Sequence, residues 1–378
     1  MHIEQAESQR GLAEETMNWL PNLPPDAIKR EHLLRTVKAA CDNSPVVFLE
    51  ADEGDGVSTF LAQFAMKQVG AAISLFVKPA SRFSYGVDYL RQIIAEQYHW
   101  HTKQQSLSSE VVAPELFNAL QMRMRSKVRY QTVYFVVDGI HQIPADDRRN
   151  LEAIFRDILP IGVTGFRFLI AGNQSELCTY LGKERSSNYR MLKFSDLEAE
   201  QYLKDLQLSG KDLSEITEVA AGNVGKLASI RRIIQGGTPW SSLAAASLSS
   251  YPDFIKQEFK NLSSFRREEL LVVATVAHSR HPMSAADVAD VVDVVTEAEV
   301  IGVLQKCTFI RSAIESSIIE FTSDAHRRYA EKELEPFRKE CHNSQVAHLL
   351  DRPAFRRHLR AIISGNRGGR YEWQAVHG

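Results

Sequence analysis

The sequence predicts an α/β fold, in which a parallel sheet covered by helices is followed by an all-helical region and a winged helix. Up to about residue 194, short apolar runs that end in glycine or polar residues alternate with amphipathic segments. This alternation is typical of parallel strands joined by helices. From about residue 195 helix follows helix, and the closing pair of extended segments predicts a hairpin.

The first half contains the segments that predict the sheet. The apolar run at 46–49 is short, partly β-branched and bounded by Pro45 and a glycine-rich turn. Such a run favours a buried strand. Further strands are predicted at 72–77, 132–138 and 165–172, with helices at 28–37, 60–65, 87–94 and 114–126.

The second half reads as helices separated by glycines. We predict helices at 198–206, 214–221 and 224–235, a small-residue linker at 238–250, and helices at 265–277, after Ser284 and at 297–305. The segments 309–311 and 317–321 predict the hairpin. The predicted organisation is a lead-in at 1–30, a sheet domain at 31–194, a helical domain with linker at 195–250, a winged helix at 251–340 and a basic tail or further domain at 341–378.

Composition argues against several classes of protein. The chain has 378 residues, and its 44% of hydrophobic residues is ordinary for a globular protein. Its formal net charge of −2 gives no overall attraction to a polyanion such as nucleic acid. Its four cysteines show no metal-ligand spacing. We expect reduced thiols in the cytoplasm. No segment approaches the roughly 20 apolar residues of a membrane span, so no membrane contact is predicted.

A degenerate phosphate-binding loop follows the first predicted strand. The usual pattern is a buried strand, a glycine-rich turn, and Gly-Lys-Ser/Thr at the start of a helix. Here Ala51 takes the first glycine position and Val57 the position of the lysine. Backbone N–H groups that converge at a helix N-terminus bind anions. We predict that any phosphate would contact Gly54, Gly56, Val57, Ser58 and Thr59, with the Ser58 hydroxyl on Mg²⁺.

The side chains of this turn oppose strong nucleotide binding. Val57 supplies neither a cation nor a side-chain donor for the phosphates. Asp52, Glu53 and Asp55 place carboxylates close to where a phosphate would lie. We therefore expect ATP or ADP with Mg²⁺ to bind weakly or not at all. The alternative is a glycine turn that binds nothing.

Two further strand ends carry candidate site residues. Asp138 ends an apolar strand, where a carboxylate can hold hydrated Mg²⁺. His141 and Gln142 follow where a hydrolytic site would place a second acid, so we predict no catalytic residue. Asn173 follows the strand at 165–172, where a polar side chain can contact the γ-phosphate. An amide can orient water there but cannot neutralise charge.

The C-terminal tail is basic. No acidic residue occurs between Asp351 and Glu372, whereas this stretch carries arginine at 352, 356, 357, 360, 367 and 370. Such a cluster can bind nucleic-acid phosphates. The interpretation that we favour is a solvated helix face or the edge of a longer protein, which leaves nucleic acid as the less favoured partner.

In their order, these motifs resemble those of the STAND class of P-loop NTPases, close to the NACHT and NB-ARC-like groups, over residues 28–340. The resemblance rests on the loop at 51–59, the strand with Asp138-Gly139-Ile140, the segment 221–228 and the segment 321–326. It implies that the segment 221–228 belongs to a small helical domain before the winged helix. It also implies that His326 senses the diphosphate of a bound nucleotide.

The resemblance further implies a nucleotide-governed switch, oligomeric with triphosphate, that regulates signalling, transcription or antiphage defence. The residues that run such a switch differ here: Val57 replaces the lysine, the acids after Asp138 are absent, and Asn173 or Gln174 replaces an arginine. We therefore interpret the chain as a hydrolysis-deficient regulator or scaffold. It would act through a protein partner that supplies the effector or sensor, and could form a homo-oligomer.

Two alternatives stay open. One is an active AAA+ ATPase working on nucleic acid or protein, in which Lys78 or Lys226 replaces the missing lysine. The other is a DNA-binding regulator that uses the winged helix and the C-terminal arginines. Against the second, the predicted helix at 285–295 carries Asp287, Asp290 and Asp293, which would repel phosphates. We expect that helix to pack against protein.

Overall fold

The computed structural model describes residues 20–21, 23–68, 71–77, 85–103, 132–246, 248–279, 283–312 and 318–351. These residues fall into two compact units: unit 1 comprises the residues up to 204 together with 221–225, and unit 2 comprises 205–220 and everything from 226 onward. The helix predicted at 114–126, Lys78 and the arginines from residue 352 lie outside the described residues. The predicted domain boundaries at 194, 250 and 340 stay predictions.

A five-stranded parallel sheet forms the centre of unit 1, in the order β2-β3-β4-β1-β5. The four predicted strands are confirmed as β1 to β4, and β5 is an addition that its polar sequence does not predict. The strands are β1 (Val46–Glu50), β2 (Ala72–Phe76), β3 (Val133–Asp138), β4 (Phe166–Ala171) and β5 (Ser186–Arg190).

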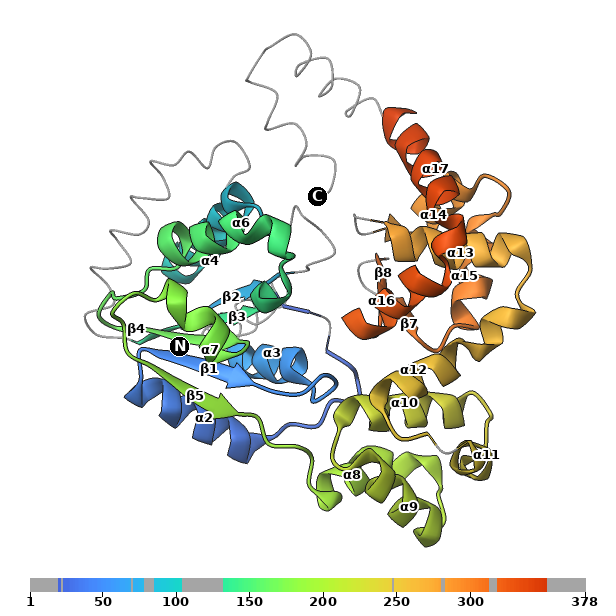
Figure 1. Cartoon of the computed structure of the whole chain (residues 1–378), viewed down its shortest axis with the longest axis horizontal. Helices are drawn as coiled ribbons and strands as arrows, with labels where there is room; N and C mark the ends of the chain where they lie inside the picture. The colour runs from blue at the N-terminus through green and yellow to red at the C-terminus, as the bar shows by residue number, and fades with distance from the viewer. Residues whose placement is uncertain are drawn as a thin grey trace, which may run out of the picture. The chain divides into compact units, whose positions relative to one another are not determined.

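Both faces of this sheet are buried, as parallel sheets require. Along β1, Val46 and Phe48 join one hydrophobic cluster, whereas Val47 and Leu49 join the other. The second cluster is covered by α2 (Glu31–Asn43) and α3 (Val57–Lys67). The first is covered by α4 (Val87–Lys103) and α6 (Arg148–Ala153), on the opposite side of the sheet in Figure 1.

Unit 1 also contains two short helices, one between β4 and β5 and one after β5. They are α7 (Gln174–Leu177) and α8 (Asp196–Leu203). A capping box fixes the start of α8, because the Ser195 hydroxyl accepts the Glu198 N–H while the Glu198 carboxylate accepts the Ser195 N–H. This cap turns the chain from the edge strand β5 into the helical part of the sequence.

Unit 2 begins with helices. Ser250 starts α12 with a capping box to Asp253, and this helix is not predicted from the sequence. The segment predicted as a linker contains α11, whose Trp240 indole donates to Glu215 at 2.9 Å. The helices are α9 (Gly210–Ala220), α10 (Val224–Gln235, whose first two residues are assigned to unit 1), α11 (Trp240–Ala245) and α12 (Tyr251–Glu258).

A winged helix follows in unit 2. The three-stranded antiparallel sheet has the order β6-β8-β7, which confirms the predicted hairpin. Two further helices, α16 (Asp324–Glu333) and α17 (Arg338–Asp351), pack against the helices of this winged helix. The winged helix consists of α13 (Arg267–His278), β6 (Met283–Ser284), α14 (Ala285–Val292), α15 (Glu297–Gln305), β7 (Ile310–Ser312) and β8 (Ile318–Phe321). The predicted fold class is thereby confirmed.

Two further properties follow from the described residues. None of their helices has the length and apolarity that crossing a bilayer would require. All four cysteines are free thiols; Cys41, Cys307 and Cys341 are buried, whereas Cys178 is partly exposed. Burial raises the pKa of Cys41 and of Cys307 to about 12, which keeps both thiols protonated and unreactive.

Candidate functional site

The turn between β1 and α3 has the backbone shape of a phosphate loop. β1 ends at Glu50 and α3 begins at Val57, so the turn joins a strand inside the sheet to a helix. Gly54 and Gly56 have φ angles of 88° and 83°, a left-handed conformation that favours glycine. No side chain caps α3 at Gly56, and Ser58 in its first turn is exposed. The predicted contact residues Gly54 to Thr59 therefore lie together.

Asp55 places a carboxylate inside this turn. Its side chain is 2% exposed. One oxygen accepts the Asp52 N–H at 3.1 Å, and the other accepts the side-chain amide of Asn223 at 3.0 Å. Burial raises the pKa of this carboxyl, because its partners are neutral donors that compensate only part of its lost hydration. The turn thus contains a buried carboxyl group of its own.

The residues after α9 close on the same turn. The Asn223 amide also donates to the Glu53 carbonyl at 3.0 Å, and the Gly225 N–H donates to the Gly54 carbonyl at 2.6 Å. The Val224 side chain lies 3.7 Å from where a Cβ on Gly56 would be. We call residues 221–225 the clamp. All of these contacts are within unit 1.

Two cations that sequence reasoning missed lie beside the turn. Arg190, at the end of β5, donates to Asp52 at 2.6 Å, and the Lys193 ammonium lies 3.5 Å from the same carboxylate. The hydrogen bond from Arg190 is the main cause of the lowered pKa of Asp52. Arg30 holds this segment in place through hydrogen bonds to the carbonyls of Leu192 and Lys193. If β5 had been predicted, its position in the sheet would have indicated that both cations lie near the turn.

The other predicted phosphate and Mg²⁺ contacts follow neighbouring strands. Asp138 ends β3, is 7% exposed, and accepts the N–H of Gly139 at 2.8 Å. Gly139 has a φ of 79°, and a Cβ there would lie 2.0 Å from the Val77 carbonyl oxygen. Asn173 caps α7 by accepting the N–H and the hydroxyl of Ser175 at 2.9 and 2.7 Å. Its amide oxygen is therefore committed to the helix start.

His326 lies in unit 2, inside a buried network of charged groups. Its Nδ1 lies 2.7 Å from the Ser323 hydroxyl oxygen, and its Nε2 lies 2.9 Å from Glu258. Arg232 makes two hydrogen bonds to the same Glu258 carboxylate, at 2.8 and 2.9 Å. A neutral ring with the proton on Nε2 fits these contacts, since Nε2–H then donates to the carboxylate and Nδ1 accepts. Burial lowers the pKa of His326, which favours that neutral form.

These groups fit a bound nucleoside triphosphate poorly. A phosphate in the turn would meet the buried Asp55 carboxylate, while Val57 offers no ammonium. Within the described ranges, no three His, Cys, Asp or Glu residues are grouped so as to hold a metal ion. Ser58 and Asp138 therefore stay predictions as Mg²⁺ ligands, and His326 stays one as a diphosphate sensor.

The chain is similar to solved structures of NTPases. It matches a Signal Transduction ATPase with Numerous Domains (STAND) protein with a tetratricopeptide repeat sensor, from Pyrococcus horikoshii, at 14% identity and a TM-score of 0.57, over 90% of this chain and 48% of that one. It spans about half the length of that protein. It also matches a Walker-type ATPase of Pyrococcus abyssi at 13% identity and a TM-score of 0.45, over 82% of this chain and 98% of that one.

In sequence, no family model matches the chain and no curated protein resembles it. The structural likeness to the Pyrococcus horikoshii protein, together with the sheet order and the turn after β1, shows that the chain has the fold of a P-loop NTPase. At 14% identity this likeness concerns the fold.

Proposed function

We propose that the chain is a STAND-like regulatory or scaffolding protein that does not hydrolyse nucleotides and works through protein contacts. The observation that carries the proposal is the turn after β1, which keeps the strand–turn–helix shape but binds its own side chains. Asp55 accepts the Asp52 N–H inside the turn, and Asn223 and Gly225 donate to it. The expected loss of nucleotide gating follows from these contacts.

Electrostatics support weak or absent nucleotide binding. A phosphate brought near Asp55 would repel a buried carboxylate, and at an effective dielectric constant of about 20 two unit charges about 4 Å apart interact by about 4 kcal/mol. Because Val57 replaces the lysine, the turn also lacks the Coulomb attraction that an ammonium group would exert on a phosphate. Arg190 and Lys193 could attract phosphate, but Asp52 already pairs with both. The net balance of charges therefore disfavours a bound triphosphate.

A protein partner is supported by apolar surface in unit 1. Leu192 is 53% exposed and Leu197 is 74% exposed, only five positions apart around the start of α8. Apolar surface that is contiguous can mark a contact surface. The similar Pyrococcus horikoshii protein carries a tetratricopeptide repeat sensor in its own chain. We propose that a partner supplies the sensor or effector here, in signalling or antiphage defence, with homo-oligomers as a further form of assembly.

Observations on the two alternatives favour neither. The Lys226 ammonium, which would have to replace the missing lysine in an active AAA+ ATPase, donates to the Val219 and Ser249 carbonyls at 3.2 and 2.6 Å. In a DNA-binding regulator the winged helix would approach phosphates, yet α14 exposes Asp290 and its C-cap is the exposed Asp293.

The experiment that tests the proposal measures turnover of ATP and GTP by the purified chain, alongside the variant Asp138→Ala. We expect the wild type and the variant to release phosphate at the same background rate. A rate well above background that disappears in Asp138→Ala would overturn the proposal, because Asp138 is the carboxylate predicted to hold Mg²⁺ in a working site. Circular dichroism of both proteins controls for folding.

A further inference from the structure

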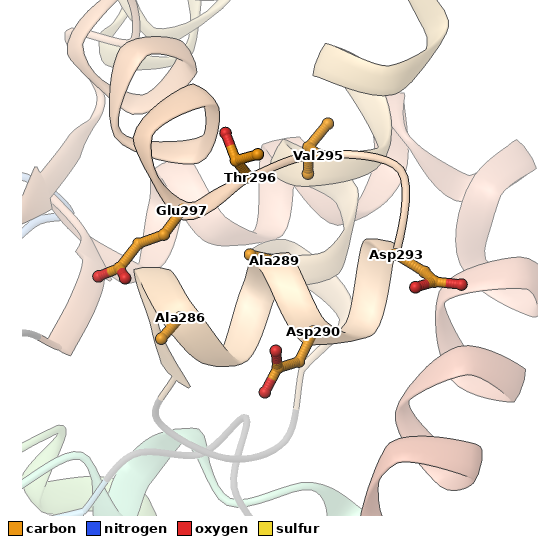
Figure 2. A pocket seen from close by; sticks show the side chains of 7 residues that line it. All are labelled: Ala286, Ala289, Asp290, Asp293, Val295, Thr296 and Glu297. Carbon is orange, nitrogen blue, oxygen red and sulfur yellow. The ribbon is translucent and has the colours of Figure 1, made fainter.

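A groove on the winged helix has an acidic rim. It lies along α14 and the start of α15 and has a volume of about 540 Å³. Figure 2 shows Asp290 on α14, Asp293 at the end of that helix and Glu297 across from them at the start of α15, with Ala286 and Ala289 between. We call this surface the acidic groove; its lining residues are Ala286, Ala289, Asp290, Asp293, Val295, Thr296 and Glu297.

Among the described residues, the rim carboxylates differ from the neighbouring acidic side chains because they have no hydrogen-bond or ion-pair partner. Asp287 and Glu299, on the same two helices, are used in capping boxes. Among the described residues, by contrast, neither a hydrogen bond nor an ion pair is made by the side-chain carboxylates of Asp290, Asp293 or Glu297. Three like charges around one concave surface repel one another, so a cationic occupant would be favoured there.

Apolar surface adjoins these charges. Val294, between Asp293 and the start of α15, is 67% exposed, and Ile301 on α15 is 42% exposed. The alanines on α14 leave room for a chain to approach the helix backbone closely. The groove therefore suits a segment that carries both arginines and apolar residues, rather than a free cation.

The sequence of this chain contains such a segment. Residues 352–370 carry six arginines and no acid, interspersed with Phe355, Leu359, Ile362 and Ile363. The helix that precedes them, α17, packs against α14 and ends at Asp351. A segment tethered this close to its binding surface has a high effective concentration, which offsets the weakness of single exposed ion pairs.

We propose that the acidic groove binds the arginine-rich segment at 352–370 of the same chain. Guanidinium groups would pair with Asp290, Asp293 and Glu297 through paired N–H···O bonds, and the apolar side chains would cover Val294. The bound arginines would be shielded from nucleic acid and from other anions. A more basic partner protein could displace the segment, so the groove also provides a competitive switch.

Limited trypsin digestion of the full chain tests this proposal, because trypsin cleaves after arginine and a bound segment is protected. The test variant is Asp290→Asn/Asp293→Asn/Glu297→Gln. A matched control, Glu176→Gln/Glu200→Gln/Glu218→Gln, makes the same change in net charge at exposed positions that do not line the groove. Cleavage at 356, 357 and 360 is followed by mass spectrometry at low salt.

We expect the groove variant to be cleaved at least about fivefold faster than the wild type, and the control variant at the wild-type rate. Raising the salt to about 0.5 M should accelerate cleavage of the wild type and leave the groove variant unchanged, since salt screens surface charges. Equal rates in all three proteins would overturn the proposal. Protection that disappears on dilution would also overturn it, because the segment would then come from a second copy.

Discussion

The two units bury a carboxylate in opposite ways. Asp55 in unit 1 is 2% exposed and accepts from a backbone N–H and an amide, both of them neutral. Glu258 in unit 2 is 4% exposed and accepts two hydrogen bonds from the Arg232 guanidinium and one from His326. The pKa of Asp55 is raised by burial, whereas burial of Glu258 is outweighed by Arg232 and His326 together, which lower its pKa to about 2.

The difference teaches what each carboxylate does. Glu258 is held as an anion by a guanidinium and joins α10, α12 and α16, so its main effect is on the stability of unit 2. Asp55 accepts its hydrogen bonds from neutral donors, in a turn whose shape suits a phosphate. Burying a carboxylate among neutral donors costs stability. We interpret it as the group that keeps phosphate out.

The largest effect is expected from breaking the charged network. Glu258→Ala leaves Arg232 and His326 without their shared acceptor, and we expect the free energy of unfolding of unit 2 to fall by about 3 kcal/mol. Hydrogen exchange read by mass spectrometry, region by region, would measure it. Glu218→Gln on the exposed face of α9 serves as the control and should change stability by less than about 0.5 kcal/mol. A loss for Glu258→Ala within that range would contradict the network's role.

Acid should destabilise unit 2 before it destabilises unit 1. The pKa of Glu258 is lowered from 4.5 to about 2, so its contribution of about 3 kcal/mol is present above pH 4.5 and lost as pH falls toward 2. His326, with its pKa lowered below 6.5, adds a loss that begins below that pH. Asp55 acts in the opposite sense, because its raised pKa favours the protonated form and its contribution grows as pH falls through that pKa. In hydrogen exchange between pH 7 and 3, unit 2 should lose protection before unit 1; the reverse order would contradict the assigned pKa directions.

A smaller effect is expected at the clamp. Asn223→Ala removes two hydrogen bonds to the turn, and we expect a loss of about 1 to 2 kcal/mol in unit 1. Asp55→Asn keeps the shape, removes the charge and should change stability by less than about 1 kcal/mol. A double-mutant cycle between the two positions should give a coupling of about 1 kcal/mol by urea denaturation. Additive effects would mean that the contact does not couple the two segments.

Much of the fold could be predicted from local pattern, because the strands β1 to β4 are buried on both faces and read as continuous apolar runs. The fifth strand could not. The sequence Ser-Ser-Asn-Tyr-Arg of β5 is polar and only partly buried, since one edge of the strand is unpaired in the sheet. Arg190 and Lys193 were missed with it. The helix α11 was missed for a related reason, because its small residues resemble a linker.

The candidate site could be predicted only where it is contiguous in sequence. Residues 51–59 carry their own signal, so the turn and the absent lysine were readable. The contact of Asn223 with Asp55 joins positions 168 apart, and nothing in local periodicity reports it. The three acids of the turn also looked alike in sequence, whereas the structure exposes Asp52 and Glu53 and buries Asp55. Which acid faces inward depends on the backbone of the turn.

The affinity of the chain for Mg²⁺–ATP tests the central claim most directly, measured by equilibrium dialysis for the wild type, Val57→Lys, Asp55→Asn and the double variant. We expect the wild type to bind more weakly than about 1 mM, each single variant to bind more tightly, and the double variant to gain at least about tenfold over either single variant. Micromolar binding by the wild type, unchanged or weakened in Val57→Lys, would contradict a turn that its own carboxylate keeps closed to phosphate.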